Sequence, residues 1–203
     1  MKITKQEILD TALDIFAERG YDSTILKDIS DRLNVTKSAL YKHYESKEAL
    51  WDALIDHVAQ YYSENFGNAE SIVIPNDMDE LTELTLRQLR FTMHDETMRK
   101  VRKLFTMEQF RNERIKALAK KYFHSNIVSI YTTIFRGMAE KGLIQMDDPE
   151  LLAFEYTAPI SMLIQIYDRE PDRESEIHRK IQEHIHYFLS VLRRDNKMEK
   201  LQK

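Results

Sequence analysis

The chain has 203 residues, and 30 lysines and arginines against 34 aspartates and glutamates give it a formal net charge of −4. It has no cysteine, which excludes disulfides, thiolate metal sites and a cysteine nucleophile. Four glycines and four prolines are too few for the tight turns of a strand-rich fold, so we expect long helices. No apolar run approaches the roughly 18 residues that span a bilayer. Charged residues interrupt the amino-terminal stretch where a signal peptide would lie, which predicts a cytoplasmic protein without a membrane span.

The first predicted element is an amphipathic helix. Apolar residues recur at spacings of three and four from Ile8 to Phe16, which is the period of one helix face. Thr4 precedes this pattern and is a suitable N-cap. Gly20 follows it, and glycine adopts the left-handed conformation at a helix end without steric cost. The pattern therefore predicts a helix between Thr4 and Gly20.

A second, short helix is predicted to begin after Ser23 or Thr24, either of which could cap it. It carries Leu26 and Ile29 inward, and Asn34 is expected to end it. Asparagine is one of the few residues other than glycine that tolerate positive φ, which a tight turn between helices requires. The pattern predicts two helices joined by a sharp turn.

Thr36 is expected to cap a third short helix, with Leu40 and Tyr44 pointing to the core. The opposite face contains no carboxylate, whereas a solvated helix face usually mixes both signs of charge. Every side chain on this face can donate a hydrogen bond or stack, so the pattern favours an anionic partner. The residues of this face are Lys37, Ser38, Tyr41, Lys42 and His43.

Three members of this face also have an ordinary structural interpretation. Tyr41 could be a partly buried packing residue, Lys42 a solvated charge, and His43 a core histidine hydrogen-bonded to a carbonyl. Ser46 is expected to cap the next helix and to place Lys47 in its first turn. A cation there opposes the helix dipole, so Lys47 needs another partner, and a DNA phosphate would supply one.

These segments resemble one known family in register and without gaps. Residues 28–30, 35–44 and 46–50, with residues 17–21 upstream, are similar to the DNA-binding signature of the TetR (tetracycline-repressor) family. The resemblance covers the stretch from Ile8 to about Leu54. It implies a helix-turn-helix whose third helix enters the major groove of double-stranded DNA.

The resemblance also implies roles for individual residues. Recognition-helix positions would meet bases and phosphates, and Tyr41 and Lys47 match the usual phosphate contacts. Ile25 departs from the family, which commonly has a phosphate-binding threonine or serine there. Ala39 offers only a methyl group, which could meet a thymine methyl. The predicted DNA-binding residues are Lys27, Thr36, Lys37, Ser38, Ala39, Tyr41, Lys42, His43 and Lys47.

The remaining two thirds of the chain predict further helices with few breaks. Asn76 or Asp77 is expected to start the fifth helix, and Asp148 to cap the eighth with Pro149 at its first position. A tail from Arg193 onward is charged, and we expect it to fray. The predicted elements are a fourth helix over residues 46–66, a loop over 67–75, a fifth helix from 77, a short sixth over 96–107, a long seventh from about 115 to Gly142, an eighth over 149–167 and a ninth over 177–192.

The last two predicted helices point to self-association. Residues 151–167 are apolar nearly all round, which requires burial on more than one side, and Pro159 is expected to kink this helix. The ninth helix has one clean stripe from Ile177 to Leu192. One side of the pair can cover its own core, and the other needs a partner. We therefore expect a homodimer formed through a four-helix bundle.

The order of helices in this region is similar to that of the TetR family, which implies an effector cavity among the fourth, fifth, seventh and eighth helices. The residue types suit a lipophilic or aromatic small molecule. The alternative is that methionines and aromatic residues at helical spacing are simply core. The candidate liners are Trp51, His94, Met107, Phe110, Tyr131, Phe135, Tyr156, Met162 and Gln165.

The combined prediction is an all-α protein with a helix-turn-helix domain over residues 1–46 and an effector and dimerisation domain over residues 47–203. We expect a ligand-responsive transcriptional regulator, acting as a repressor on a pseudo-palindromic operator. The chain has no phosphate-binding glycine loop, nucleophile elbow or paired-histidine zinc motif, so we expect neither catalysis, a cofactor nor a metal. The alternatives are an effector-independent architectural or division-linked DNA-binding protein, and a helical enzyme or carrier.

Overall fold

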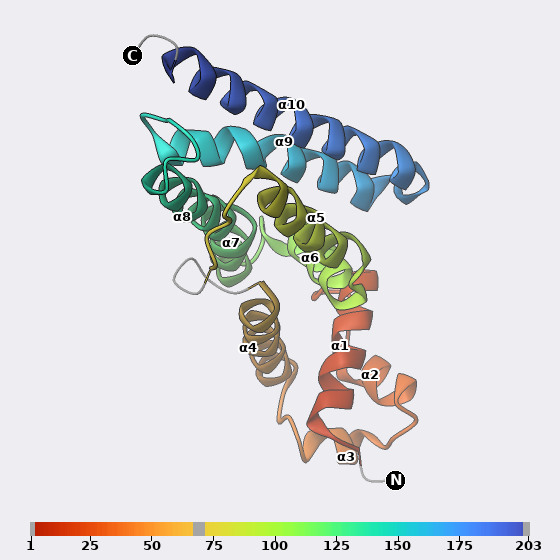
Figure 1. The fold of residues 1–203 in the computed structure, drawn as a ribbon. Coiled ribbons are helices and arrows are strands. Elements are labelled where there is room, and N and C mark those ends of the chain that lie inside the picture. Colours follow the sequence, from red (N-terminus) through yellow and green to blue (C-terminus); the bar gives the residue numbers. More distant parts are fainter. Residues whose placement is uncertain (1–2, 67–71, 201–203) are drawn as a thin grey trace. The chain divides into compact units, whose positions relative to one another are not determined.

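The computed structural model describes residues 3–66 and 72–200, which form helices and connecting segments in agreement with the predicted all-α class (Figure 1). Residues 67–71 of the predicted loop lie outside the described residues. The α-helices are α1 (Lys5–Arg19), α2 (Leu26–Arg32), α3 (Lys37–Tyr41), α4 (Lys47–Phe66), α5 (Met78–His94), α6 (Glu96–Glu108), α7 (Glu113–Lys120), α8 (Asn126–Glu140), α9 (Pro149–Arg169) and α10 (Glu174–Lys200).

The chain divides into two compact units. The first comprises Met1–Phe66 together with Glu96–Lys120, and the second comprises Gly67–Asp95 together with Lys121–Lys203. The first unit therefore contains α6 and α7 as well as the four amino-terminal helices. No boundary between the two compact units falls at residue 46, because α4 and α6 both pack on α1.

Local side-chain signals explain where several helices begin and end. Thr4 and Glu7 form a capping box at α1, with Thr4 Oγ1 accepting from the Glu7 N–H at 3.2 Å and Glu7 Oε2 accepting from the Thr4 N–H at 2.8 Å. Gly20 ends α1 with φ 81°. Asp148 caps α9 by accepting from the N–H groups of Glu150 and Leu151, and Pro149 stands at the first helical position. These predictions from the sequence are confirmed.

The predicted cap of the second helix is wrong. The N-cap of α2 is Ile25, whose N–H donates to the Asp28 carboxylate at 2.9 Å. The Thr24 hydroxyl instead donates to the carbonyl of Gly20 at 2.8 Å. An apolar side chain therefore occupies the start of α2, while a carboxylate one turn later satisfies the free backbone donor.

The long seventh helix of the sequence prediction is three helical pieces. A π-helical turn, η1 (Lys121–Ser125), lies between α7 and α8, and the boundary between the two compact units falls at its start. Such turns are rare and are absent from a simple 3.6-residue pattern. The charged segment from Arg193 continues the backbone of α10 as far as Lys200.

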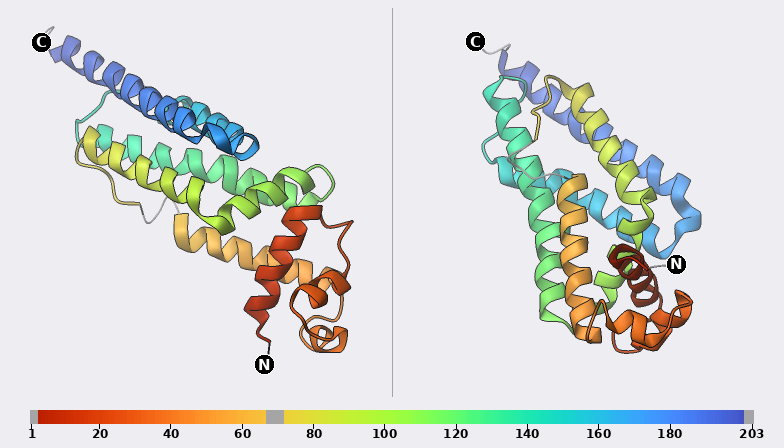
Figure 2. Two further views of the ribbon diagram at one scale, coloured as in Figure 1. Left: turned by 90° about the vertical axis from the view of Figure 1, so that its right-hand side faces the viewer. Right: turned by 90° about the horizontal axis from the view of Figure 1, so that it is seen from below.

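The core of the second unit is built mainly by α8, α9 and α10, with α9 and α10 running side by side (Figure 2). It encloses a small polar cluster, here called the hydroxyl cluster, of Thr85, Gln88, Tyr131 and Tyr156. The Thr85 hydroxyl lies 2.9 Å from the Tyr156 hydroxyl, and the Tyr131 hydroxyl lies 3.0 Å from Thr85 Oγ1 and 2.9 Å from Gln88 Oε1. Burial raises the pKa of Tyr131 to about 12, so its buried phenol stays neutral.

None of the helices in the described part of the chain combines the length and apolarity needed to cross a membrane.

The helix α9 continues through Pro159 from Pro149 to Arg169. Near this proline, the His184 Nε2 of α10 lies 2.9 Å from the backbone carbonyl of Tyr156 and ties the two helices together.

Candidate nucleic-acid interface

The turn between α2 and α3 follows from the backbone conformation of one asparagine. Asn34 has φ 52°, and within the described residues it is the one residue other than glycine with positive φ. The Asn34 N–H donates to the Asp31 carbonyl at 3.1 Å, and the Val35 N–H donates to the Ser30 carbonyl at 3.0 Å. This pair of bonds is a Schellman motif, which closes α2 and redirects the chain sharply. The predicted helix-turn-helix is confirmed.

The helix α3 is oriented by its cap and two buried anchors. Thr36 Oγ1 accepts from the Ala39 N–H at 3.2 Å. Leu40 is completely buried and Tyr44 is 8% exposed, so both side chains fix the same side of the turn to the core of the first unit. The residues on the other side are consequently held toward solvent.

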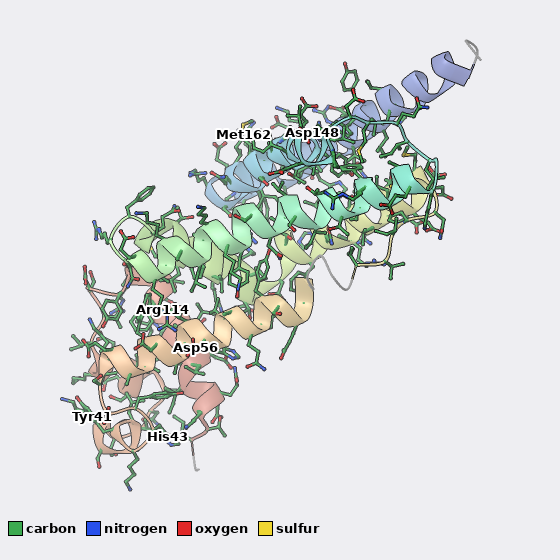
Figure 3. All side chains as sticks on the ribbon, turned by 90° about the vertical axis from the view of Figure 1, so that its left-hand side faces the viewer. Tyr41, His43, Asp56, Arg114, Asp148 and Met162 are labelled. Carbon is green, nitrogen blue, oxygen red and sulfur yellow. The ribbon has the colours of Figure 1, made fainter. Side chains whose placement is uncertain are left out.

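The exposed face of α3 has the composition that the sequence predicts. Lys37, Ser38 and Lys42 are exposed, and Tyr41 is 42% exposed. Ala39 is half-buried, and so is His43, which together with Lys42 follows the end of α3 at Tyr41. Lys37 Nζ lies 5.5 Å from the centre of the Tyr41 ring, so the ammonium group and the aromatic ring form one continuous surface. Figure 3 labels Tyr41 and His43 on this part of the first unit.

A groove of about 470 Å³ lies beside this face. It is lined by residues 25–27 at the start of α2, by Lys37 and Tyr41 of α3, and by residues 45–48 at the start of α4. The groove thus gathers three lysines, two glutamates and one exposed aliphatic side chain, Ile25, which is 57% exposed. We call it the basic groove.

Two of the lysines in the basic groove have partners in the first unit. Lys27 Nζ lies 2.6 Å from the Asp31 carboxylate, which raises the pKa of Lys27 above its ordinary value. Lys47 Nζ donates to the carbonyls of Tyr21 and Thr24 at 3.0 Å each, and it lies 4.1 Å from the Tyr21 ring centre. These contacts explain how a cation is held in the first turn of α4 against the helix dipole.

The contacts of Lys47 were not foreseen from the sequence. Both acceptors belong to the connection between α1 and α2, more than 20 residues away. Two backbone carbonyls left free by an irregular connection carry no residue-type signal. The predicted phosphate contact of Lys47 remains a prediction, since its ammonium group has three protons to donate.

The connection between α1 and α2 is also held from α6. The Tyr21 N–H donates to Glu108 Oε1 at 2.9 Å, and Glu108 is 5% exposed. The Tyr21 side chain packs on Trp51, with ring centres 4.7 Å apart. Burial first, and then the charge and hydrogen bond of Glu48, raise the pKa of Tyr21 to about 12. A neutral tyrosine thus stays packed beside the basic groove.

The predicted effector-site residues do not form one cluster. Tyr131, Phe135 and Tyr156 meet in the core of the second unit, with the Tyr131 and Tyr156 ring centres 5.1 Å apart. Met162 and Gln165 line a separate hollow of about 210 Å³ between α8 and α9. His94 is elsewhere in that unit, where its Nε2 lies 3.6 Å from the Glu174 carboxylate.

The other three predicted effector-site residues belong to the first unit. Trp51 is 4% exposed and packs against Phe16 and Tyr21, and its indole N–H has no hydrogen-bond partner among the described residues. Met107 is half-buried on α6. Phe110 is 87% exposed between α6 and α7. The described side chains include no group of three or more histidines and carboxylates that could hold a metal ion.

Comparison with known proteins connects the helix-turn-helix to one family. Residues 8–54 match the family model described as bacterial regulatory proteins of the tetR family. A 58-residue stretch is 40% identical to IcaR of Staphylococcus epidermidis, the HTH-type negative transcriptional regulator of the biofilm operon icaADBC. This match covers 29% of the chain and 31% of that relative, so it spans less than a third of either protein.

Solved structures extend the similarity of the fold to nearly the whole chain. SmeT, the repressor of the Stenotrophomonas maltophilia multidrug efflux pump SmeDEF, matches in its triclosan complex with 18% identity, a TM-score of 0.71 and coverage of 92% of this chain and 90% of that one. The transcriptional regulator FadR from Bacillus subtilis, in complex with stearoyl-CoA, matches with 16% identity, a TM-score of 0.61 and coverage of 92% and 98%. Residues 8–54 therefore match the amino-terminal domain of the tetR family, and the fold of nearly the whole chain is similar to that of these regulators.

Proposed function

We propose that the chain is a ligand-responsive transcriptional repressor that binds a pseudo-palindromic operator as a homodimer in the cytoplasm. The observation that supports it most is the exposed, acid-free face of α3. Leu40 and Tyr44 are buried and anchor this segment, so Lys37, Tyr41 and Lys42 are exposed. Of these three residues, Lys37 and Tyr41 line the basic groove. An ordered surface of donors and one aromatic ring suits the phosphates and base edges of a major groove.

The residues of the interface divide by the contact they would make. Lys37, Ser38 and His43 would reach base edges, and Ala39 would meet a thymine methyl. Tyr41, Lys42 and Lys47 would contact phosphates, with Lys27 at the rim and Thr36 holding the cap of α3. We propose a functional division into a DNA-binding domain over residues 1–46 and an effector and dimerisation domain over residues 47–203.

Self-association would use the outer stripe of α9. Leu151, Phe154 and Met162 are 53%, 46% and 59% exposed and lie on one side of that helix. Figure 3 shows Met162 directed away from the core of the second unit. On α10, Tyr187 and Val191 are also exposed apolar side chains. Two copies of this pair of helices would bury these side chains in a four-helix bundle. The two DNA-binding domains of the dimer would then lie about one DNA turn apart.

A small-molecule effector is the natural regulator of such a protein. Two structures similar to this chain hold triclosan and stearoyl-CoA, and each of these ligands includes an apolar part. For this chain we propose a lipophilic or aromatic effector, with the residues of the hydroxyl cluster among its candidate contacts. Such a ligand would act through its different affinities for the DNA-binding and the released states. Neither an architectural role nor catalysis has a comparable supporting feature.

The reading face is tested by the double substitution Tyr41→Ala with His43→Ala. Both changes leave the packing of Leu40 intact, so the circular dichroism spectrum and thermal midpoint should match those of the unmodified chain. Affinity for the DNA upstream of the chain's own gene should fall at least about thirtyfold, as expected for two lost contacts of about 1–3 kcal/mol each. The control is the double substitution Phe110→Ala with Lys116→Ala. It changes two exposed residues, one between α6 and α7 and one on α7. Unchanged affinity of the first variant would remove α3 as the reading helix.

A further inference from the structure

The basic groove contains one side chain that the charge pattern does not explain. Ile25 is 57% exposed, although it is a large β-branched residue at the N-cap of α2. Its neighbours around the groove include Lys27, Lys37 and Tyr41. An exposed isoleucine side chain has no favourable interaction with water. The charged side chains around it also make the groove unsuitable for binding an apolar protein surface.

The fold of the first unit does not require this side chain. The backbone of Ile25 is extended, with φ −117° and ψ 156°, and its N–H donates to the Asp28 carboxylate at 2.9 Å. The Asp28 N–H in turn donates to the Ile25 carbonyl at 3.0 Å. The main chain of residue 25 is therefore held in place by Asp28, while the side chain remains available for a partner.

We infer that Ile25 is a DNA-binding residue whose side chain contacts an apolar group of the duplex, either a thymine 5-methyl group or a deoxyribose. The inference rests on the proposed function. A duplex combines phosphates that suit the lysines of the basic groove with apolar sugar and methyl groups next to them. The first helix of a helix-turn-helix crosses the DNA backbone, which would bring the start of α2 to that boundary.

The two apolar groups of DNA predict different consequences. A deoxyribose is present at every nucleotide, so a sugar contact would strengthen binding to all duplexes equally. A thymine methyl is present at particular positions only, so that contact would strengthen binding to the operator alone. Ile25 also cannot make the hydroxyl–phosphate bond of a threonine or serine at this position. The start of α2 would thus contact an apolar group of the DNA, where a threonine or serine would contact a phosphate.

The experiment measures the Kd of the full chain and of Ile25→Val and Ile25→Ala by fluorescence anisotropy. The probes are the upstream fragment that the unmodified chain protects, a random duplex of the same length, and the upstream fragment with single dT→dU replacements, which delete one methyl each. We expect a loss of about fourfold for Ile25→Val and at least about tenfold for Ile25→Ala, following the carbons removed from a buried contact. Val73→Ala is the matched control, because Val73 is 81% exposed and lies in the other unit.

Each outcome has a definite meaning. A loss confined to the upstream fragment, together with one dT→dU change that removes the difference in affinity between the unmodified chain and the Ile25→Ala variant, supports the thymine contact. An equal loss on all three probes supports the deoxyribose contact. Affinity within twofold of the unmodified chain on every probe, or an equal loss in Val73→Ala, overturns the inference and leaves the repressor proposal intact. Failure of the unmodified chain to bind any duplex contradicts the proposed function itself. Ile25→Val keeps the β-branched shape and serves as the test if Ile25→Ala alters the fold.

Discussion

Arg114 of α7 donates to the carboxylate of Asp56 on α4 at 2.6 Å (Figure 3). The same guanidinium also binds Asp52, one turn earlier on α4. One arginine therefore spans two carboxylates at i and i+4, and it connects α7 to the helix that begins at the basic groove. This contact joins parts of the first unit that are 58 residues apart in the chain.

Substitution Arg114→Ala should lower the free energy of unfolding by about 0.5–1 kcal/mol. The three partners are 42%, 61% and 76% exposed at their side chains, so solvent screening keeps the value in the range of surface pairs. The loss should shrink at a salt concentration of about 1 M, where charges are screened over about 3 Å. Urea unfolding at two salt concentrations measures it. Lys116→Ala, which breaks the pair with Glu113 inside α7, should cost less. Equal losses for both variants would assign Arg114 no role in joining the helices.

Glu108 should stabilise the connection between α1 and α2. Replacing it with alanine leaves the partly buried Tyr21 N–H without its acceptor, at a cost of about 1–3 kcal/mol. Glu108→Gln retains an acceptor oxygen and should lose about 1 kcal/mol or less. Thermal and urea unfolding of both variants test the difference. If Glu108→Gln were as destabilised as Glu108→Ala, the hydrogen bond to Tyr21 would not be the stabilising contact.

The hydroxyl cluster should be sensitive to loss of its central member. Thr85→Val deprives the buried Tyr156 hydroxyl of its partner at 2.9 Å, and we expect a cost of about 1–3 kcal/mol. Thr82→Val is the matched control on the same helix, since the Thr82 hydroxyl only donates to the Met78 carbonyl within α5. That variant should stay within about 0.5 kcal/mol of the unmodified chain. Equal stability of the two variants in urea would show that the cluster does not depend on Thr85.

Tyr21 should make the protein less stable at alkaline pH. Its pKa is raised to about 12 in the folded chain, above the value near 10 of an unfolded tyrosine. The contribution of the protonated Tyr21 phenol to the free energy of unfolding is complete below about pH 10. It is lost as the pH rises through about 12, because the unfolded chain releases the phenolic proton at lower pH than the folded chain. Urea midpoints measured between about pH 9 and about pH 12 should fall less steeply for Tyr21→Phe than for the unmodified chain. Identical slopes would mean that the Tyr21 phenol titrates normally.

The outer stripe of α9 should control oligomeric state. Met162→Glu places a charge among exposed apolar side chains and should convert a dimer into a monomer in sedimentation velocity, because an unpaired charge at such an interface costs several kcal/mol. Val73→Glu introduces the same charge at an exposed apolar residue off α9 and α10 and should remain a dimer. A Met162→Glu chain that stays dimeric would move the interface elsewhere.

The features predictable from the sequence are those with local causes. Thr4, Asn34 and Asp148 each act on backbone groups within four residues, and the structure confirms all three. The cap of α2 was mispredicted because Thr24 satisfies an acceptor behind it, the Gly20 carbonyl, in place of a donor ahead of it. Both uses suit the same hydroxyl group, so residue type alone does not distinguish them.

Contacts between distant segments were not predictable in the same way. The Tyr21 N–H meets a carboxylate 87 residues later, and no spacing rule connects Tyr21 with Glu108. The π-helical turn at Lys121–Ser125 likewise interrupts an apolar pattern that fits one long helix. The reading face of α3 was predictable because its exposure depends only on Leu40 and Tyr44, its neighbours in sequence. The effector residues were grouped by type, and their positions in the two units show how little type determines placement.

The measurement that tests the central claim most directly is fluorescence anisotropy of the purified chain with DNA from upstream of its own gene. It is made at two salt concentrations and with excess competitor DNA. We predict saturable binding that resists the competitor, with two protomers per pair of half-sites. Binding that the competitor abolishes, with a steep loss of affinity at higher salt, would show contact with phosphates only and would contradict a sequence-specific repressor.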